Sequence, residues 1–244
     1  MLALLKRNFT LYFRNRSGVF FSLLGALISF LLYIIFLQKN LTDAWSQLPD
    51  KTSLLNNWLM GGTLAVTGIT TSFTALTQMV QDREHQVDQD LFLTDLGSWG
   101  LQVSYLISSI VISFVMQLFM FVVMSLYFQE VPVWSQIAEV ALIMLLSSVL
   151  SSLVNAILIH RFQSVDSLGK LATIVGTASG FLVGTYVPLG VLPNFAQLLM
   201  KCTPATYIAS LYRQVFMKEQ LADTFAGNSD LLAEFQEKMG IVLK

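Results

Sequence analysis

The sequence predicts an all-α polytopic membrane protein, and two observations lead to this fold class. Of its 244 residues, 55% are hydrophobic and only 12% are charged, whereas a typical soluble domain carries about 25% charged residues. The apolar residues also gather in repeated runs of roughly 20 residues, the length that a helix needs to cross a bilayer. Residues 1–244 are therefore expected to form a single transmembrane domain.

The first 16 residues predict an amphipathic helix that lies on the membrane surface. An apolar face with basic flanks suits the headgroup boundary. The apolar positions are Leu2, Leu5, Phe9, Tyr12 and Phe13, and the basic ones are Lys6, Arg7, Arg14 and Arg16. A basic flank that only fixes the topology is an equally good interpretation. Both interpretations place this end of the chain in the cytoplasm.

Five membrane spans are expected after this helix. They cover residues 18–38, 57–80, 101–128, 134–159 and 171–187. Loops on the cytoplasmic side of a membrane carry an excess of Lys and Arg. The inner segments contain Lys6, Arg7, Arg14, Arg16, Arg83, Arg161 and Lys170, whereas the outer segments contain Lys39 and Lys51. This distribution predicts a cytoplasmic N-terminus.

Three spans carry small or polar residues in regular patterns. The second span has threonines on one helical face, at Thr63, Thr67, Thr70, Thr71 and Thr74. They fit either packing residues that return their hydroxyls to the backbone, or one wall of a hydrated or amphiphile-accepting path. The fourth span has a small polar face suited to close helix contact, at Ser147, Ser148, Ser151, Ser152 and Asn155. In the fifth, a helix-packing seam within or between protomers is predicted by a ridge of Gly176, Gly180 and Gly184.

A charged segment over residues 81–96 separates the second and third spans. Its ionisable residues are Asp82, Arg83, Glu84, His85, Asp88, Asp90 and Asp95. Charged side chains are costly in lipid, so this segment is where the membrane part can meet a soluble partner. A solvated loop that merely obeys the topology is the alternative interpretation.

Prolines interrupt the C-terminal third of the chain. Pro188, Pro193 and Pro204 remove helix donors from an apolar segment that continues to Met217. Broken helices at membrane depth need shielding by protein or water. We therefore expect short helices that re-enter from the outer face over residues 188–216, followed by an amphipathic outer tail over residues 217–244.

Missing motifs exclude several classes of function. The sequence contains no GxxxxGK[ST] loop for nucleotide phosphates, no HExxH pair for zinc and no GxSxG elbow. Cys202 is the single cysteine, which excludes a multi-cysteine metal site, and His85 and His160 are interpreted as solvated loop residues. The span centres hold no ionisable residue, which argues against an ion-coupled carrier. Energy for any transport must then enter from outside the bilayer.

Two stretches of the chain resemble the membrane subunits of type-2 ABC exporters, the bacterial permeases that pair with a separate ATP-binding subunit. The first is Asp82-Arg83-Glu84 followed by Leu91 to Asp95. The second is the ordered set Pro188, Leu192-Pro193, Pro204, Tyr207 and Arg213. His85-Gln86 and Asp95 depart from the family pattern, and the sixth span usual in such permeases is not found.

The resemblance implies a mechanism and assigns residues to it. Two permease copies or paralogues would surround a substrate path lined by the threonines, in the cell membrane. ATP and Mg would be bound by the ATPase subunit, so this chain would be no enzyme and hold no cofactor or metal, and nucleic acid is not expected as a partner. The ATPase would dock on Asp82, Arg83, Glu84, His85, Asp88, Asp90, Leu91 and Phe92. The outer gate would be Pro188, Pro193, Pro204, Tyr207 and Arg213.

A non-transporting membrane scaffold or immunity-type protein is the alternative function. It is favoured by the lack of a catalytic constellation and by the glycine ridge. A membrane-embedded enzyme is a weaker hypothesis, because no set of acid, base and nucleophile occurs at membrane depth.

Overall fold

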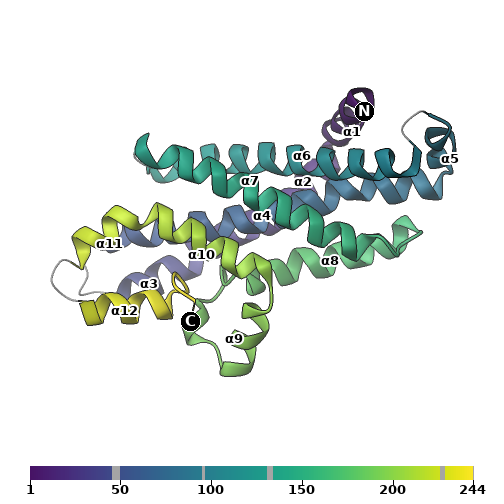
Figure 1. Ribbon diagram of the computed structural model, residues 1–244. Coiled ribbons are helices and arrows are strands. Elements are labelled where there is room, and N and C mark those ends of the chain that lie inside the picture. Colours follow the sequence, from purple (N-terminus) through teal and green to yellow (C-terminus); the bar gives the residue numbers. More distant parts are fainter. Residues whose placement is uncertain (46–49, 95–96, 131–133, 226–228, 244) are drawn as a thin grey trace.

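The computed structural model is an elongated helical bundle (Figure 1). It describes residues 1–45, 50–94, 97–130, 134–225 and 229–243. Its helices before the C-terminal third are α1 (Leu2–Arg14), α2 (Arg16–Leu32), the π-helix η1 (Tyr33–Leu37), α3 (Gln38–Ala44), α4 (Lys51–Glu84), α5 (Val87–Phe92), α6 (Gly97–Phe128), α7 (Trp134–Ile159) and α8 (Val165–Leu182). The later ones are η2 (Leu189–Val191), α9 (Asn194–Lys201), α10 (Pro204–Phe216), α11 (Lys218–Thr224) and α12 (Ser229–Lys238).

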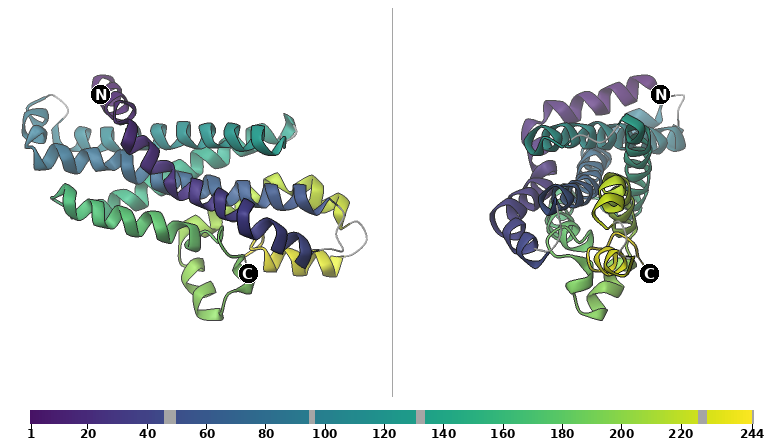
Figure 2. Two further views of the ribbon diagram at one scale, coloured as in Figure 1. Left: turned by 180° about the vertical axis from the view of Figure 1, so that it is seen from behind. Right: turned by 90° about the vertical axis from the view of Figure 1, so that its left-hand side faces the viewer.

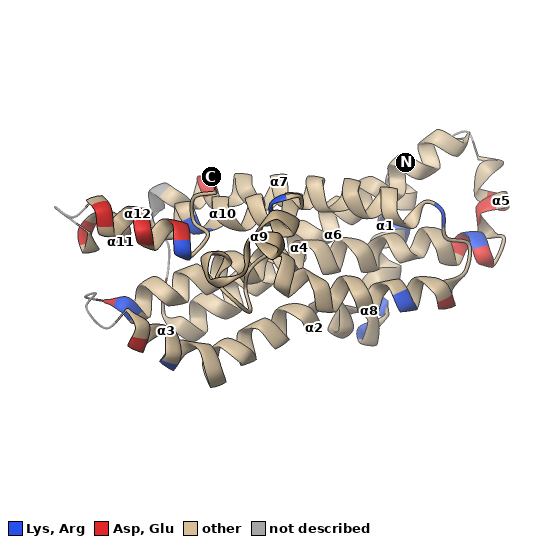
Figure 3. Ribbon diagram, turned by 90° about the horizontal axis from the view of Figure 1, so that it is seen from below, with Lys and Arg blue, Asp and Glu red and all other residues tan. Residues whose placement is uncertain are grey.

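Within the part of the chain that the structure describes, four helical segments are long and apolar enough to cross a membrane. They are Arg16–Ala44, Lys51–Glu84, Gly97–Phe128 and Gln136–Ile159. The first three contain the first three predicted spans, and the last covers the fourth except its first two residues. The all-α polytopic fold class is thereby confirmed. Charged residues gather at the two ends of the bundle and leave its middle largely free of them (Figure 3).

Helix α8 differs from the predicted fifth span of residues 171–187. It begins earlier, because the Ser164 hydroxyl caps its first turn by accepting a hydrogen bond from the Ser167 amide at 3.2 Å. Its first turns therefore include Asp166 and Lys170. It ends at Leu182, ahead of Gly184, which has a left-handed φ of +69°. Whether α8 crosses the membrane stays a prediction.

Helix α4 is the element around which the others pack. It contacts α2, α6, α7, α8 and α10, and 83% of its most apolar stretch is buried inside the protein, against 33% to 44% for the other three candidate spans. Small residues allow this close approach. A Cβ atom on Gly68 would lie 2.7 Å from the Ser147 hydroxyl of α7, and one on Gly62 would lie 2.6 Å from the Thr185 hydroxyl.

The predicted glycine ridge is wrong at one of its three positions. Gly184 lies beyond the end of α8 in a turn, so it shares no helical face with Gly176 and Gly180. Gly180 is covered by the ring of Tyr186 from the same segment, and a Cβ atom there would lie 2.1 Å from that ring. The carbonyl of Gly176 lies 3.2 Å from the Cβ position of Gly25 on α2, so this part of α8 packs closely on α2.

The predicted short helices of the C-terminal third are present, and each proline stands where a helix begins. Pro188 and Pro193 precede η2 and α9, and Pro204 is the first residue of α10, positions where a missing N–H costs little. Helix α10 packs on α4 and α7. Figure 2 shows α1, α2 and α3 following one another across the opposite face. Re-entry of this region into the membrane stays a prediction.

The tail after Met217 packs its apolar face on the rest of the bundle. Phe225 and Phe235 join a buried cluster with Trp45 and Trp58, and the Trp58 indole N–H donates to the Met239 carbonyl at 2.8 Å. The tail thus covers the end of the bundle opposite α5 (Figure 1).

The close packing at Gly68 leads to a stability prediction. Gly68→Val should lower the free energy of unfolding by about 1–3 kcal/mol, because the added atoms collide with α7 and α6. The midpoint of thermal unfolding in detergent measures this change. Gly169→Val is the control, since a Cβ atom there meets nothing within 4 Å. Equal midpoints for the two variants would contradict the packing argument.

Candidate functional site

The charged segment forms a turn and a short helix at one end of the bundle. Helix α4 ends at Glu84, the chain turns at Gln86 with a left-handed φ of +59°, and α5 follows before the chain enters α6. Figure 1 shows α5 projecting at this end, near α1. Asp95, the last charge of the predicted segment, lies outside the described residues.

Asp82 is buried, contrary to its predicted contact with an ATPase. Its carboxylate, 3% exposed, accepts two hydrogen bonds from the Arg7 guanidinium of α1 at 2.7 and 2.8 Å. The Gln78 amide donates to it at 2.8 Å, and the Tyr105 hydroxyl of α6 donates as well. The hydrogen bonds with Asp82 raise the pKa of Arg7 further, so that it stays charged. Asp82 therefore holds α1 and α6 against α4 rather than facing a partner.

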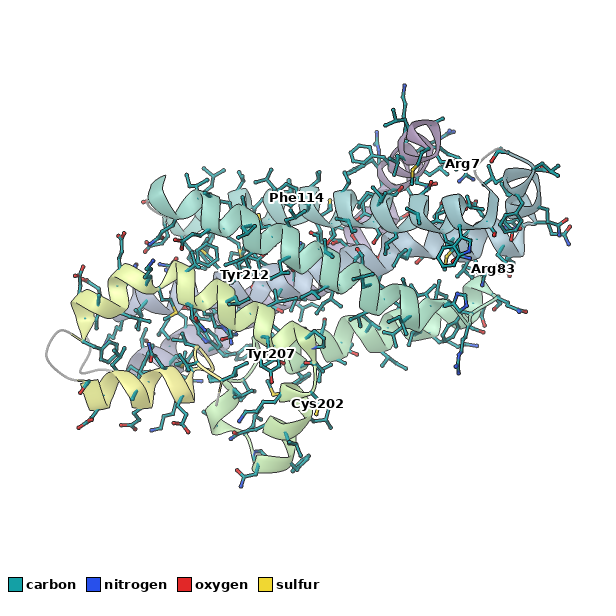
Figure 4. All side chains as sticks on the ribbon, viewed as in Figure 1. Arg7, Arg83, Phe114, Cys202, Tyr207 and Tyr212 are labelled. Atoms are coloured by element: carbon teal, nitrogen blue, oxygen red, sulfur yellow. The ribbon has the colours of Figure 1, made fainter. Side chains whose placement is uncertain are left out.

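Arg83 and Glu84 bind the connection between α7 and α8. The Arg83 guanidinium donates to the carbonyls of His160 and Phe162 at 3.2 and 3.1 Å. The Glu84 carboxylate accepts a hydrogen bond from the backbone N–H of Val165 at 2.9 Å, a negative charge at the positive end of α8. The Asp-Arg-Glu triplet thus joins the end of α4 to α1, α6 and α8. Figure 4 marks Arg7 and Arg83 at this end.

The same end of the bundle exposes large apolar side chains. Leu93 and Trp99 are 87% and 81% exposed, and Phe92 is 42% exposed, beside the exposed His85 and Asp90. Exposed aromatic and aliphatic side chains next to polar ones are typical of a protein interface. Leu93 and Trp99 were not predicted as site residues, although apolar residues inside a polar segment were the available signal. Leu91 packs instead against a buried cluster.

The threonine stripe divides into two groups. Thr63, Thr67 and Thr71 are fully buried, so their predicted place on the wall of a path is wrong. The hydroxyls of Thr67 and Thr71 donate to the carbonyls four residues before them, at 2.8 and 2.6 Å. This is how threonine packs inside a helical membrane protein. Thr70 and Thr74 face a cavity.

The cavity lies between α2, α4 and α8 and has a volume of about 750 Å³. Its walls combine aromatic rings with hydroxyls. The aromatic residues are Phe21, Phe73, Phe181 and Tyr186, and the threonines are Thr70, Thr74, Thr77, Thr173 and Thr177. Cavities of 300–1,000 Å³ with mostly apolar walls and a few polar groups hold drug-sized molecules. Thr77, which continues the stripe one step beyond Thr74 on α4, was not predicted. Thr173 and Thr177 were not predicted either, because they lie on α8 and the stripe concerns one helix.

Arg213, a predicted gate residue, is a buried brace. Its guanidinium donates to the carbonyl of Gly184 at 2.9 Å, and at 3.4 Å to those of Val183, Trp58 and Gly240. It also stacks over the Trp58 ring, 4.5 Å from its centre. These contacts join α4, the turn after α8 and the tail. Arg213 cannot line a path in this arrangement, because its side chain is completely enclosed.

Tyr207, the other gate residue with a large polar side chain, is half exposed on α10 (Figure 4). Tyr212, on the same helix, is buried and donates to the Gln117 side chain of α6 at 2.7 Å. Gln117 in turn donates to Ser148 of α7 at 2.8 Å. The predicted polar face of the fourth span thus takes part in helix contact. A gating role for Tyr207 and the prolines stays a prediction.

Four long apolar helices, charged ends and a cavity between α2, α4 and α8 are the features of a multi-pass membrane protein. The family model described as ABC-2 type transporter matches residues 1–217. The chain belongs to this family, as its sequence resemblance indicated, and is a permease component of an ABC transporter. No curated protein and no solved structure matches the chain.

The buried Asp82 leads to a second stability prediction. Arg7→Ala should destabilise the protein by about 3–5 kcal/mol, because it leaves a buried carboxylate without its counter-charge. Chemical denaturation followed by tryptophan fluorescence measures this loss. Lys170→Ala breaks the exposed Lys170–Asp166 pair and should cost at most about 1 kcal/mol. Equal losses for both variants would refute the bracing role of Asp82.

Proposed function

We propose that the chain is the membrane subunit of an ATP-driven exporter, coupled to a separate ATP-binding subunit that holds ATP and Mg. Family membership supports this proposal. The single observation that carries the coupling is the exposed apolar surface formed by Phe92, Leu93 and Trp99 at the α5 end. A protein partner that covers these side chains removes apolar surface from water. Tryptophan is also enriched among the hot spots of protein interfaces.

A path for the mechanical signal runs from this surface to the cavity. Movement of α5 displaces the end of α4, which Glu84 joins to the first residue of α8. Helix α8 carries Thr173 and Thr177 on the cavity wall. A push on α5 would therefore shift two walls of the cavity together, as packed helices move as rigid bodies.

The face that carries α2 and α8 suits a second permease copy or a paralogue. It exposes Phe20, Phe21, Ile28, Ile174 and Phe181, apolar residues that lipid or a second subunit would cover. Two such subunits would enclose the cavities between them. We place the protein in a bacterial cell membrane with the α5 end and the N-terminus in the cytoplasm, which the distribution of Lys and Arg supports.

Removing the exposed Trp99 ring at the α5 end tests the proposed association with the ATPase subunit. Trp99→Ala should weaken association with the ATPase subunit at least tenfold, because an interface tryptophan contributes about 2 kcal/mol or more. Co-purification and ATPase stimulation in proteoliposomes measure this. Leu126→Ala, an equally exposed residue on the opposite end of α6, is the control. Unchanged association for Trp99→Ala combined with Leu93→Ala would favour the scaffold alternative.

Glu84 offers a separate test of signal transmission. Glu84→Gln keeps the docking surface intact but weakens the bond to the α8 N-terminus, so ATPase association should persist while transport per ATP hydrolysed falls several-fold. Asp166→Asn, in the first turn of α8, is the matched control because its ion pair is exposed. Loss of association in Glu84→Gln would show that this carboxylate docks the partner instead.

A further inference from the structure

The cavity between α2, α4 and α8 extends along much of the inner half of the bundle. On α2 its lining runs from Gly18 to Leu32, about 21 Å at helical rise. A smaller pocket of about 80 Å³ shares Gly18, Thr74 and Thr77 with it and lies against α1. Amide side chains line this pocket, at Asn8, Asn15, Gln78 and Gln81. The cavity therefore has a long apolar body and a polar end beside α1.

The threonine hydroxyls on the cavity wall already donate their protons to backbone carbonyls, while Tyr186 adds a phenolic hydroxyl to the lining. Each threonine donates to the carbonyl four residues before it: Thr70 to Val66 at 3.1 Å, Thr74 to Thr70 at 2.9 Å, Thr77 to Phe73 at 3.2 Å, Thr173 to Gly169 at 3.2 Å and Thr177 to Thr173 at 2.8 Å. A hydroxyl has one donor proton and two acceptor lone pairs. The two threonine rows, on α4 and on α8, therefore present methyl groups and acceptor oxygens to the cavity.

The residues that line the cavity include no Asp, Glu, Lys, Arg or His. A charged molecule placed there would lose its hydration without gaining a counter-charge, which is strongly unfavourable. A neutral molecule that offers hydrogen-bond donors gains partners on both walls. A neutral molecule that offers only acceptors would leave the threonine oxygens unpaired, and its partners would be limited to the Tyr186 hydroxyl and the amide side chains at the polar end.

We propose that this cavity binds an uncharged amphiphile whose polar groups are hydrogen-bond donors. Its apolar body lies among the rings of Phe21, Phe73 and Phe181, and its donors meet the threonine rows of α4 and α8. As the identity of a transported substrate, this inference rests on the proposed function. As a binding property, it can be measured on the chain alone, without an ATPase subunit.

Three fluorescent probes with the same aromatic ring system separate the effect of a hydrogen-bond donor on binding from the effect of charge. N-phenyl-1-naphthylamine is neutral and has an N–H donor, and its N-methyl derivative is neutral without the donor. The third probe, 5-anilinonaphthalene-1-sulfonate, keeps the donor free but adds a negative charge. Full-length protein in phosphatidylcholine nanodiscs is titrated with each probe, and saturable fluorescence above that of empty nanodiscs reports binding. The neutral donor should bind about tenfold more tightly than its N-methyl derivative, the ratio expected for one lost hydrogen bond. It should bind at least about tenfold more tightly than the sulfonate, whose charge would lose hydration without gaining a counter-charge.

Two pairs of variants locate the site. Gly176→Leu fills the cavity, since a Cβ atom there meets nothing within 4 Å, and it should abolish saturable binding. Gly169→Leu on the same helix is equally free of collisions, lies outside the cavity and should bind as the wild type does. Thr74→Val with Thr177→Val should weaken the neutral donor about tenfold and leave its N-methyl derivative unchanged. The corresponding pair of serine substitutions should restore binding.

Three results of the probe titrations would overturn the inference. The first is that the sulfonate binds as tightly as the neutral donor. The second is that Gly176→Leu still binds the neutral donor. The third is that the variant with Thr74→Val and Thr177→Val binds the neutral donor as tightly as the wild type does. The inference would also be overturned if no protein bound any probe and if the protein were a dimer that only Gly176→Leu dissociates. That result would assign the cavity to contact with a second copy of the chain. Saturable binding without ATPase association or transport would refute the proposed function and leave the binding site standing.

Discussion

Close packing around α4 is the constraint on which the rest of the structure depends. In lipid, helices gain little from burying apolar side chains against one another, so they associate where small residues allow backbones to approach and polar groups to pair. Helix α4 supplies both. Gly61, Gly62 and Gly68 admit α10, the turn after α8, and α7, while the carbonyl of Gly68 accepts a hydrogen bond from Ser113 of α6. The outer helices keep their long apolar side chains for the lipid.

Charged groups fix the two ends of this packed unit in different ways. At the α5 end, Asp82 is neutralised by Arg7 and further held by Tyr105, a charged pair near the polar boundary. At the opposite end, Arg213 is surrounded by backbone carbonyls and the Trp58 ring. Each joins segments distant in sequence. Between them lie the cavity and the polar contacts among α4, α6, α7 and α10, so both ends position the part of the molecule that we assign to transport.

The residues that we propose to transmit a signal and those that we propose to receive a partner are distinct at the α5 end. The Asp-Arg-Glu triplet of residues 82–84 makes its hydrogen bonds inside the protein, with α1, α6, the connection after α7 and the start of α8. The partner surface is left to the apolar side chains beyond them. Because Glu84 joins the end of α4 to the first residue of α8, movement of the proposed docking surface would reach α8 and the cavity.

The sequence by itself determined the class of the molecule. Low charge, long apolar runs and the basic inner segments predicted the helices and their order, because these properties depend on local composition. The first four spans and the short helices after Pro188 were predictable in this way, whereas the family was indicated by the resemblance of two motif stretches. Only the tertiary structure decided which polar residues are exposed. Thr70 faces a cavity and Thr71 does not, Asp82 is buried although it stands in the most polar segment, and Gly184 leaves the helix that its spacing implied. Each of these outcomes depends on what other helices contribute at that place, such as Arg7 beside Asp82 or α8 opposite Thr70, and such contacts between distant segments leave no periodic signal in the chain.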